Sequence, residues 1–586
     1  MTTAPAIADT SETVIDSLLS RCRVFEQRKD FAAVRREALH FLAGNRSDVA
    51  ALALLGRTEL RLGRAGRALA PLKRCVKQSG NFIFRLLYAH CLKRLGHADE
   101  AAEELASAGR SMPVSGAAFF AAGVTFEGVG EIDLAIRFYR QSLLLAPGVP
   151  CVSHRLGRHL LDKGKPEEAL ELINTAIAGK ADEAYYHLDQ GVALELTGRL
   201  EESLAAVDNA IAVAPDNPEA LHNRSHLLLL LNRSGAAITA ADRALEVRPD
   251  YPATLFTRAT ALLKVGRWEE GWREYEWRWR SCQTPRTDIR CPPWEGGDLR
   301  GRHILLHAEQ GLGDSLQFVR FATLVARLGA RVSLHVPEPL VRLFRRVQGV
   351  SDVFSTLSSD AVFDCHCPLA SLPMMFGITP ETVPAAPYLS VAPEMAAKQG
   401  DPVRRLAENG DGNPRDLIVG LVWSGAPRKN KVRSYALDER RSLKLADLEP
   451  LFSVSGIRFV SFQLDEAAQQ RVETGFPLTD VTQGITDFAD TAARLTGTDL
   501  LITVDTSIAH LAAGMGWPVW MLSRFDGCWR WLEGRSDTPW YPTMRIIRQE
   551  APGDWAGAVG AARRMLAGEV QQRQFYREKA LSENLT

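Results

Sequence analysis

The stretch HAEQGLGDSLQFVRF, residues 307–321, joins an apolar run to an amphipathic one through a glycine-rich turn that holds Asp314. The run before the turn predicts a strand, and the run after it predicts a helix. Such a turn presents free backbone N–H groups and the positive end of a helix dipole, where an anionic group can bind. We therefore predict a functional loop here, with Gly311 and Gly313 beside Asp314.

Two more stretches place polar residues directly after an apolar run. In VWSGAPRKNKVRSYALDERRSLKL, a Ser424-Gly425 turn precedes seven basic and two acidic residues between positions 428 and 444. This composition suits a phosphate, although a solvated surface loop would have the same composition. In VDTSIAHLAAGMG, Asp505 ends a strand and Thr506-Ser507 begin a helix, so hydroxyl and amide groups can both bind phosphate oxygens. Alone, Asp-Thr-Ser could be a helix cap and nothing more.

The elements that must position these loops follow from the alternation of apolar runs and helical periods after residue 303, which predicts a parallel sheet flanked by helices. In the first half, HILLHA, RVSLHV and AVFDCH predict strands, and residues 315–328 and 338–346 predict helices. A polar stretch at 393–416 has the composition of a hinge. In the second half, LIVGLVWSG, IRFVSFQL, DLLITVD and WPVWMLS predict strands. Two such halves leave a ligand cleft at the carboxyl ends of their strands.

A helix is also predicted near 554–568, opened by Asp554 and Trp555. We expect it to pack back on the first half.

The first half of the chain contains an internal repeat of 33 or 34 residues. A turn residue recurs at Lys29, Gly63, Gly96, Gly130, Gly164, Gly198, Asn232 and Gly266. Five positions later stand mostly small residues: Val34, Ala68, Ala101, Ala135, Ala169, Ser203, Ala237 and Gly271. This pattern resembles tetratricopeptide repeats, which stack into a superhelix whose concave face binds a peptide or a partner helix. The alternative is that the repeats only dimerise the chain or space its domains.

The last repeat ends in WEEGWREYEWRWR, residues 268–280, whose aromatic residues do not follow one helical face. We interpret it as a joint to the next domain. The following residues, CQTPRTDIRCPPWEGGDLRGR, have the composition of an irregular linker.

The bulk composition excludes several classes of protein. The 70 basic residues balance 70 acidic ones, which does not support a nucleic-acid or membrane-surface role. No secretory signal and no long apolar run is apparent, so we expect a cytoplasmic protein. Nine cysteines in 586 residues fit free thiols. The CHC stretch at 365–367 has no second cluster to complete a metal site, and we expect it to be buried for structural reasons.

Five stretches in order resemble the heptosyltransferase-like, family 9 glycosyltransferases that occur fused behind tetratricopeptide repeats. They are HAEQGLGDSLQFVRF, GLVWSG, RRSLKL, ITVDTSIAHLAAGMGWPVW and WRWLEGRSDTPWYPTMRIIRQ. The resemblance covers about residues 268–568. The architecture is also similar to that of O-linked N-acetylglucosamine transferases, and bacterial flagellin glycosyltransferases are the nearest functional analogue.

The resemblance implies an α-solenoid followed by an α/β GT-B fold of two Rossmann-like halves. The expected parts are a disordered N-terminus (1–11), the repeat superhelix (12–282), a linker (283–302), an acceptor-side half (303–400), a donor-side half (417–570) and a tail (571–586).

The resemblance also implies roles for individual residues. Asp314 would be the general base that deprotonates the acceptor hydroxyl, and His510 could neutralise the leaving phosphate. The implied donor-binding residues are Ser424, Gly425, Arg441, Ser442, Asp505, Thr506, Ser507 and His510. Additional candidates are Gln310, Gly311, Gly313, Lys431, Gln463 and Trp529. One departure is SRFDGCWRW, where relatives have a Pro-Asp-Trp turn. Nearby Trp529, Trp531, Trp540 and Tyr541 could stack on a sugar or base, or belong to the core.

These features predict an inverting, metal-independent protein O-glycosyltransferase that needs no cofactor besides its nucleotide-sugar substrate. Its expected acceptor is a serine or threonine of a protein held by the repeats, with flagellin as the first candidate and a CMP-linked nonulosonic acid as a candidate donor. Two alternatives stay open, a saccharide-modifying enzyme of the cell envelope and a non-catalytic scaffold or secretion adaptor that senses a nucleotide sugar. Homo-oligomers are compatible with all three, and no nucleic acid or membrane span is expected.

Overall fold

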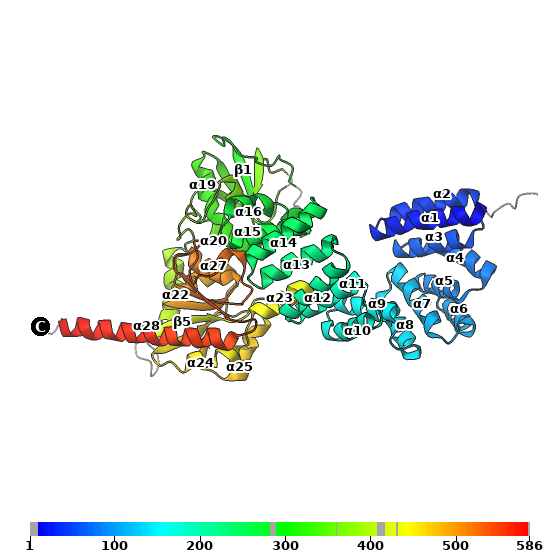
Figure 1. The fold of residues 1–586 in the computed structure, drawn as a ribbon. Coiled ribbons are helices and arrows are strands. Elements are labelled where there is room, and N and C mark those ends of the chain that lie inside the picture. The colour runs from blue at the N-terminus through cyan, green and yellow to red at the C-terminus, as the bar shows by residue number, and fades with distance from the viewer. Residues whose placement is uncertain (1–9, 282–288, 359, 407–415, 429–431, 584–586) are drawn as a thin grey trace, which may run out of the picture. The chain divides into compact units, whose positions relative to one another are not determined.

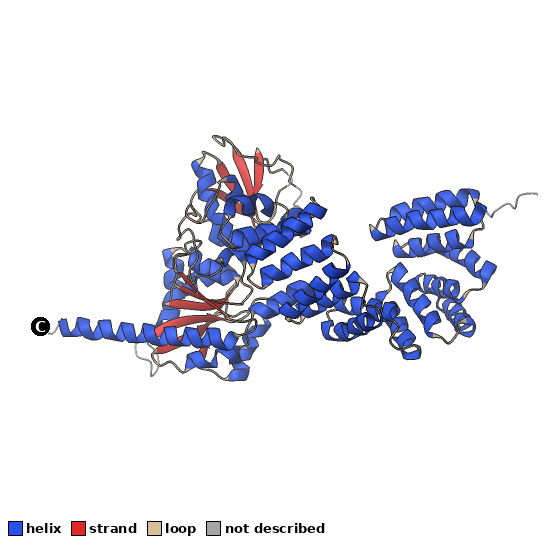
Figure 2. Cartoon of the chain, viewed as in Figure 1, coloured by secondary structure: helices blue, strands red, loops and turns tan. Residues whose placement is uncertain are grey.

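The computed structural model describes residues 10–281, 289–358, 360–406, 416–428 and 432–583 (Figure 1). The chain divides into two compact units, Met1–Ala193 and Leu194–Thr586. The first contains most of the repeats. The second contains the last repeats and two parallel sheets, drawn as separate groups of red strands in Figure 2.

The predicted solenoid is confirmed as consecutive helix pairs. Its helices are α1 (Thr10–Gln27), α2 (Phe31–Gly44), α3 (Val49–Arg61), α4 (Ala65–Ser79), α5 (Phe82–Arg94), α6 (Ala98–Ser111), α7 (Gly116–Val129), α8 (Ile132–Leu145), α9 (Pro150–Asp162), α10 (Pro166–Gly179), α11 (Ala184–Leu196), α12 (Leu200–Val213), α13 (Pro218–Leu230), α14 (Ser234–Val247), α15 (Pro252–Lys264) and α16 (Trp268–Tyr275). The short α17 (Arg278–Ser281) follows.

The repeat positions predicted from the sequence have a common backbone conformation. All eight turn residues have positive φ, from 55° at Asn232 to 88° at Gly130. A helix that ends in this left-handed region favours glycine, because a Cβ atom is strained there. The small residues five positions later are all buried, since they lie where paired helices approach each other.

The first sheet has the parallel order β3-β2-β1-β4. Its strands are β1 (His303–His307), β2 (Arg331–His335), β3 (Val350–Phe354) and β4 (Cys365–Pro368), with α18 (Leu312–Phe318), α19 (Ala322–Arg327) and α20 (Glu338–Phe344) between them. The predicted strands and helices are present, although β4 begins four residues later than the apolar run. The edge strand β3 was not predicted, because its residues are only partly buried and do not form an apolar run.

The second sheet has the parallel order β10-β9-β8-β5-β6-β7. Its strands are β5 (Leu417–Val422), β6 (Ile457–Ser461), β7 (Leu478–Asp480), β8 (Leu500–Val504), β9 (Val519–Ser523) and β10 (Met544–Arg548). The edge strands β7 and β10 were not predicted. In both sheets the first strand lies in the interior and the chain then continues on its other side, at β1/β4 and at β5/β8. Ligands of doubly wound folds bind at this reversal.

The polar stretch at 393–416, predicted as a hinge, contains helix α22 (Pro393–Arg405), which packs on α26 (Phe488–Leu495). Residues 407–415 of this stretch lie outside the described residues. The prediction for the last helix was wrong. The C-terminal helix α28 (Trp555–Glu583) packs on α24 (Glu449–Phe452), β9 and β10 of the second half, not on the first half (Figure 1). Its apolar face, which includes Val559 and Leu566, shares a core with the residues of β5.

The predicted N-terminal segment and linker lie only partly within the described residues. The N-terminus up to residue 9 and linker residues 283–288 lie outside the described residues. The predicted tail from 571 is continuous with α28 as far as Glu583.

The predicted aromatic joint is confirmed. Trp268, Trp272 and Tyr275 are buried among residues of the first and second halves. The Trp268 ring stacks on Trp540 at a centroid distance of 4.9 Å, and Trp272 Nε1 donates to the Ile378 carbonyl at 3.1 Å. The end of the repeat array is therefore part of one apolar core with both sheets.

Candidate active site

Asp314 lies at the carboxyl end of β1, in the first turn of α18. Its Oδ2 atom accepts a hydrogen bond from the Gly311 backbone N–H at 2.9 Å, which closes the glycine-rich turn. The side chain of Asp314 is 25 % exposed, so the carboxylate can be reached from outside.

The other carboxylate oxygen of Asp314 contacts Arg530 Nη2. Arg530 also donates to Gln317 Oε1 at 2.5 Å and lies 4.3 Å from the Trp529 ring centroid. Burial alone would lower the pKa of Arg530, but Asp314, Cys528 and Tyr275 together outweigh it and raise that pKa, so Arg530 stays a cation. Sequence reasoning did not assign Arg530 a role, although it lies in the WRW segment of a stretch that carries the resemblance.

The two sheets meet beside this loop, where α18 packs on α27 (Ser507–Gly514). A methyl group built on Gly313 would lie 3.0 Å from His510 Cδ2 and 3.6 Å from the Ser507 Cα atom. The glycine therefore permits an approach that another residue would obstruct. The Asp314 loop and the loop of Asp505 to His510 are brought together, as predicted.

The loop after β8 is held by contacts from two other segments. Asp505 Oδ2 accepts a hydrogen bond from Trp531 Nε1 at 3.0 Å, and its carbonyl accepts one from Arg441 Nη1 at 3.4 Å. Thr506 is the N-cap residue of α27, but its hydroxyl bonds to the Val504 carbonyl, not to a helix amide. The loop is thus fixed without use of its helix N-terminus.

The charge role that the resemblance implies for His510 does not fit its surroundings. The ring is buried, stacks on Trp531 at 5.3 Å and pairs through Nδ1 with the Tyr541 hydroxyl at 2.9 Å. Burial, together with the charge of Arg530, lowers the pKa of His510 to about 3. At neutral pH His510 is uncharged, so it can offer a hydrogen bond but cannot neutralise a phosphate.

The predicted residues after β5 also lie together. A methyl group on Gly425 would lie 2.7 Å from Arg441 Nη2, and the Gly425 N–H donates to Ser442 Oγ at 3.3 Å. Gln463, after β6, accepts from the Ser424 N–H at 2.9 Å and donates to the Ser424 carbonyl at 3.0 Å. Four predicted donor-binding residues and the additional candidate Gln463 therefore form one group.

Asp438 organises the cations of this loop and was missed by sequence reasoning. Its side chain is 1 % exposed and pairs with Arg428 at 2.9 Å and with Arg441 at 3.0 Å. Burial opposes ionisation, but hydrogen bonds from Arg428 and the charge of Arg441 lower the pKa of Asp438 below its ordinary value. The spacing Asp438-x-x-Arg441 on helix α23 (Val432–Arg441) was the available signal.

Both arginines point to an anion site. Pairing with Asp438 raises the pKa of Arg428, and Asp314 is near enough to raise it further. The buried Nε–H of Arg441 has no hydrogen-bond partner among the described residues. A guanidinium that retains an unused donor above a glycine can bind a phosphate oxygen.

A cleft of about 350 Å³ connects these loops. The second half lines it with Ser424, Gly425, Gln463, Thr506 and Ser507, and the first half adds Leu312 and Pro339. Phe462, Leu464, Ile485, Phe488 and Ile508 add apolar side chains to the wall, and Asp465, Thr486, Asp487 and Thr491 add polar ones. The volume and the mixed lining are typical of a small-ligand site. A larger hollow of about 530 Å³, lined by residues near 289–292 and 357–363, contains none of the predicted site residues.

The remaining candidates lie elsewhere. Trp529, Trp531, Trp540 and Tyr541 are buried in the core, with Trp529 packed on Trp272, so packing accounts for all four. Lys431 lies outside the described residues.

The side chains of the CHC stretch are packed in the first half. Cys365 and Cys367 are buried, and His366 Nδ1 pairs with His307 Nε2 at 3.2 Å. Within the part of the chain that the structure describes, no group of three or more His, Cys, Asp or Glu residues is arranged to hold a metal ion. Among the same residues, no helix is long and apolar enough to cross a membrane.

Comparison with known proteins supports the repeats. Tetratricopeptide-repeat families match residues 154–218 and 218–251. Protein FlbA of Caulobacter vibrioides is 29 % identical over 327 residues, which are 51 % of this chain and 52 % of the relative. The chain thus spans about half the length of this curated relative.

Solved structures match the chain over part of its length. MamA is 19 % identical and covers 28 % of this chain and 94 % of its own, with a TM-score of 0.26. The tetratricopeptide-repeat protein YrrB is 17 % identical and covers 32 % and 97 %, with a TM-score of 0.27. The two family matches show that the chain contains tetratricopeptide repeats, a class that typically binds proteins.

Proposed function

We propose that the chain is an inverting glycosyltransferase of the GT-B type, which moves a sugar from a nucleotide-sugar donor to a serine or threonine of a protein held by the repeats. The observation that carries the proposal is that loops after β1, β5 and β8, from two parallel sheets, contribute residues to the lining of one cleft. The loop after β1 also carries Asp314, which is near enough to Arg428 of the loop after β5 to raise its pKa.

The donor would occupy the second-half side of the cleft. The apolar wall around Phe462 and Phe488 suits a nucleobase, and the polar rim at Ser424 and Thr506 suits the ribose and phosphates. The cations of Arg428 and Arg441 would stabilise the negative charge that develops on the leaving phosphate. Asp438 keeps both cations in place.

The acceptor hydroxyl would approach from the first-half side. Asp314 would take its proton while the hydroxyl oxygen attacks the anomeric carbon and the bond to the nucleotide breaks. Arg530 orients the carboxylate, because it binds one oxygen and leaves lone pairs on the other. A positioned base of this kind contributes about 10²- to 10⁴-fold to the rate.

Flagellin is the protein acceptor that we propose, and a CMP-linked nonulosonic acid the donor, both through the resemblance of the sequence motifs. A long array of protein-binding repeats favours a protein over a small saccharide, because a saccharide does not need such a surface.

The test begins with thermal shifts in the presence of UDP, CMP, GDP and ADP, for the wild type and for Arg441→Ala. One nucleotide should raise the melting temperature of the wild type, and the variant should lose that shift. If no nucleotide gives a shift, the protein is a scaffold and not a transferase.

The second step measures transfer to the acceptor with Asp314→Asn. We expect at least a 100-fold loss of turnover at unchanged nucleotide affinity. The matched control is Asp447→Asn, because Asp447 closes a similar turn through the Lys444 N–H at 2.8 Å, away from the cleft. Undiminished transfer by Asp314→Asn would show that another group is the base, and transfer to a free saccharide alone would favour the envelope enzyme.

A further inference from the structure

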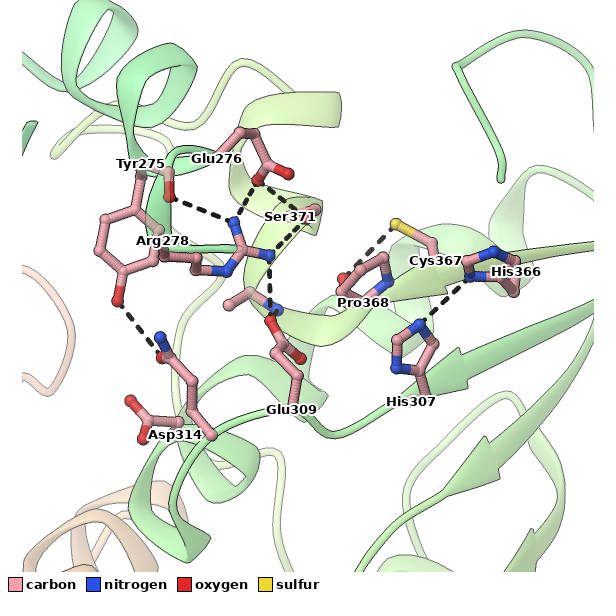
Figure 3. A network of polar contacts seen from close by, with 12 residues as sticks. Tyr275, Glu276, Arg278, His307, Glu309, Asp314, His366, Cys367, Pro368 and Ser371 are labelled. Atoms are coloured by element: carbon pink, nitrogen blue, oxygen red, sulfur yellow. Dashed lines mark hydrogen bonds and ion pairs between the residues drawn. The ribbon is translucent and has the colours of Figure 1, made fainter. Parts of the chain in front are cut away.

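The loop that carries Asp314 is anchored to the end of the repeat array (Figure 3). Tyr275 in α16 donates through its hydroxyl to Gln310 Oε1 at 3.3 Å. Arg278 in α17 pairs through Nη2 with Glu309 Oε1 at 3.0 Å. Glu309 and Gln310 stand directly before the glycines of the loop, so both contacts act within five residues of Asp314.

The Arg278 side chain is fully buried and binds several segments at once. Besides Glu309, its guanidinium donates to Glu276 Oε1 at 2.5 Å and to Ser371 Oγ at 2.7 Å. Ser371 follows strand β4. Figure 3 shows the guanidinium between these three side chains. Arg278 therefore connects the loop after β1 to the loop after β4. These two strands are neighbours at the point where the strand order of the first sheet reverses.

Stability alone does not explain this arrangement. Replacing a buried ion pair with apolar side chains of similar size is often neutral or stabilising, and the surrounding joint is already apolar. Burial raises the pKa of Glu309 to about 7 despite the charge of Arg278. Keeping the Glu309 carboxylate ionised in this buried position therefore costs free energy. Compared with an apolar contact, the ion pair adds geometric specificity, because the donors of the planar guanidinium fix the positions of their partners.

The loop itself needs such an external anchor. Gly311 and Gly313 have no side chains with which to hold the turn, and the close packing of Gly313 on His510 leaves no room for one. Besides the Gly311 N–H and Arg530, which bind its carboxylate directly, the position of Asp314 thus depends on contacts at the two ends of the loop, which are Glu309 on one side and helix α18 on the other.

We infer that Arg278 is a positioning residue for Asp314, which it holds in place through Glu309, so that the last helices of the repeat array complete the transfer site. This inference rests on the proposed function. It means that the repeats do more than hold an acceptor, because the acceptor-side loop is built on their final segment.

The experiment uses the full chain with a double variant, Arg278→Met/Glu309→Leu, and with Glu309→Gln. The double variant removes both charges of the buried pair, so it should fold and be as stable as the wild type. The control is Asp499→Asn, which breaks an ion pair of 3.0 Å with Arg404. Asp499 directly precedes β8, at the end of that strand opposite to the site loops.

The first measurement is hydrogen exchange of peptides that cover residues 307–318, which requires no activity. We expect exchange at least 10-fold faster in the double variant and an intermediate increase in Glu309→Gln, with no change in Asp499→Asn. Wild-type exchange in the double variant would overturn the inference.

The second measurement is turnover per nucleotide-binding site, which corrects for any unfolded fraction. We expect at least a 10-fold lower kcat in the double variant, with a donor Kd within twofold of the wild type. Wild-type kcat would overturn the inference. If the wild type transfers no sugar, the proposed function fails, and the exchange experiment still decides whether Arg278 positions the loop.

Discussion

The contact between α18 and α27 at Gly313 provides a quantitative prediction for Gly313→Ala. The new methyl carbon would lie 3.0 Å from His510 Cδ2, about 0.5 Å inside an ordinary carbon–carbon contact of roughly 3.5 Å. His510 cannot easily move, because it is buried between Trp531 and Tyr541. Overpacking of this kind costs about 1–3 kcal/mol, while alanine in a helix gains at most about 1 kcal/mol over glycine. We expect a net loss of about 0–2 kcal/mol.

The matched control is Gly568→Ala. Gly568 lies in the interior of α28 and is exposed, and a Cβ atom added there would have no heavy atom within 4 Å. This variant should gain up to about 1 kcal/mol from helix propensity alone. The difference between the two variants, about 1–3 kcal/mol, then isolates the steric cost at Gly313.

The assay is urea unfolding followed by tryptophan fluorescence, together with nucleotide titration. All 12 tryptophans lie at or after position 268, so this signal reports only the second unit. Gly313→Ala should also weaken nucleotide binding, because the contact with His510 would push α18 and α27 apart, and Ser507 at the start of α27 lines the cleft. If Gly313→Ala were as stable as Gly568→Ala and bound nucleotide normally, the close approach of the two halves would be refuted.

Further predictions concern the joint and two buried groups. Trp268→Ala should cost about 3–5 kcal/mol in urea unfolding, since it removes a fully buried ring stacked on Trp540; a loss below about 1 kcal/mol would contradict the joint. The pKa of His510 is lowered to about 3, so the wild type should lose about 2 kcal/mol between pH 6.5 and pH 5, and His510→Asn should show a smaller loss over the same range. Burial also lowers the pKa of Lys264 to about 8, so wild-type stability should rise by about 2 kcal/mol from pH 8 to pH 9.5. Lys264→Met should remove that rise, and an unchanged pH profile in the variant would show that another group titrates.

The sequence predicted the repeats because their signals are local. Each turn residue occupies a left-handed conformation that glycine tolerates, and each small residue lies between two helices next to each other in the chain. The three site loops were predictable for a similar reason, since each directly follows a buried strand. The edge strands β3, β7 and β10 were missed, because their short or partly exposed segments do not form a clear apolar run.

The partners of the site residues depended on segments far apart in the chain. Arg530 reaches Asp314 across 216 positions, and Arg278 reaches Glu309 across 31. The sequence by itself therefore determined the repeat period, the parallel halves and the loops that carry polar groups. Only the tertiary structure decided which cation meets which carboxylate, that His510 is uncharged, and that the end of the repeat array contacts the Asp314 loop, because burial and pairing arise where distant segments pack together.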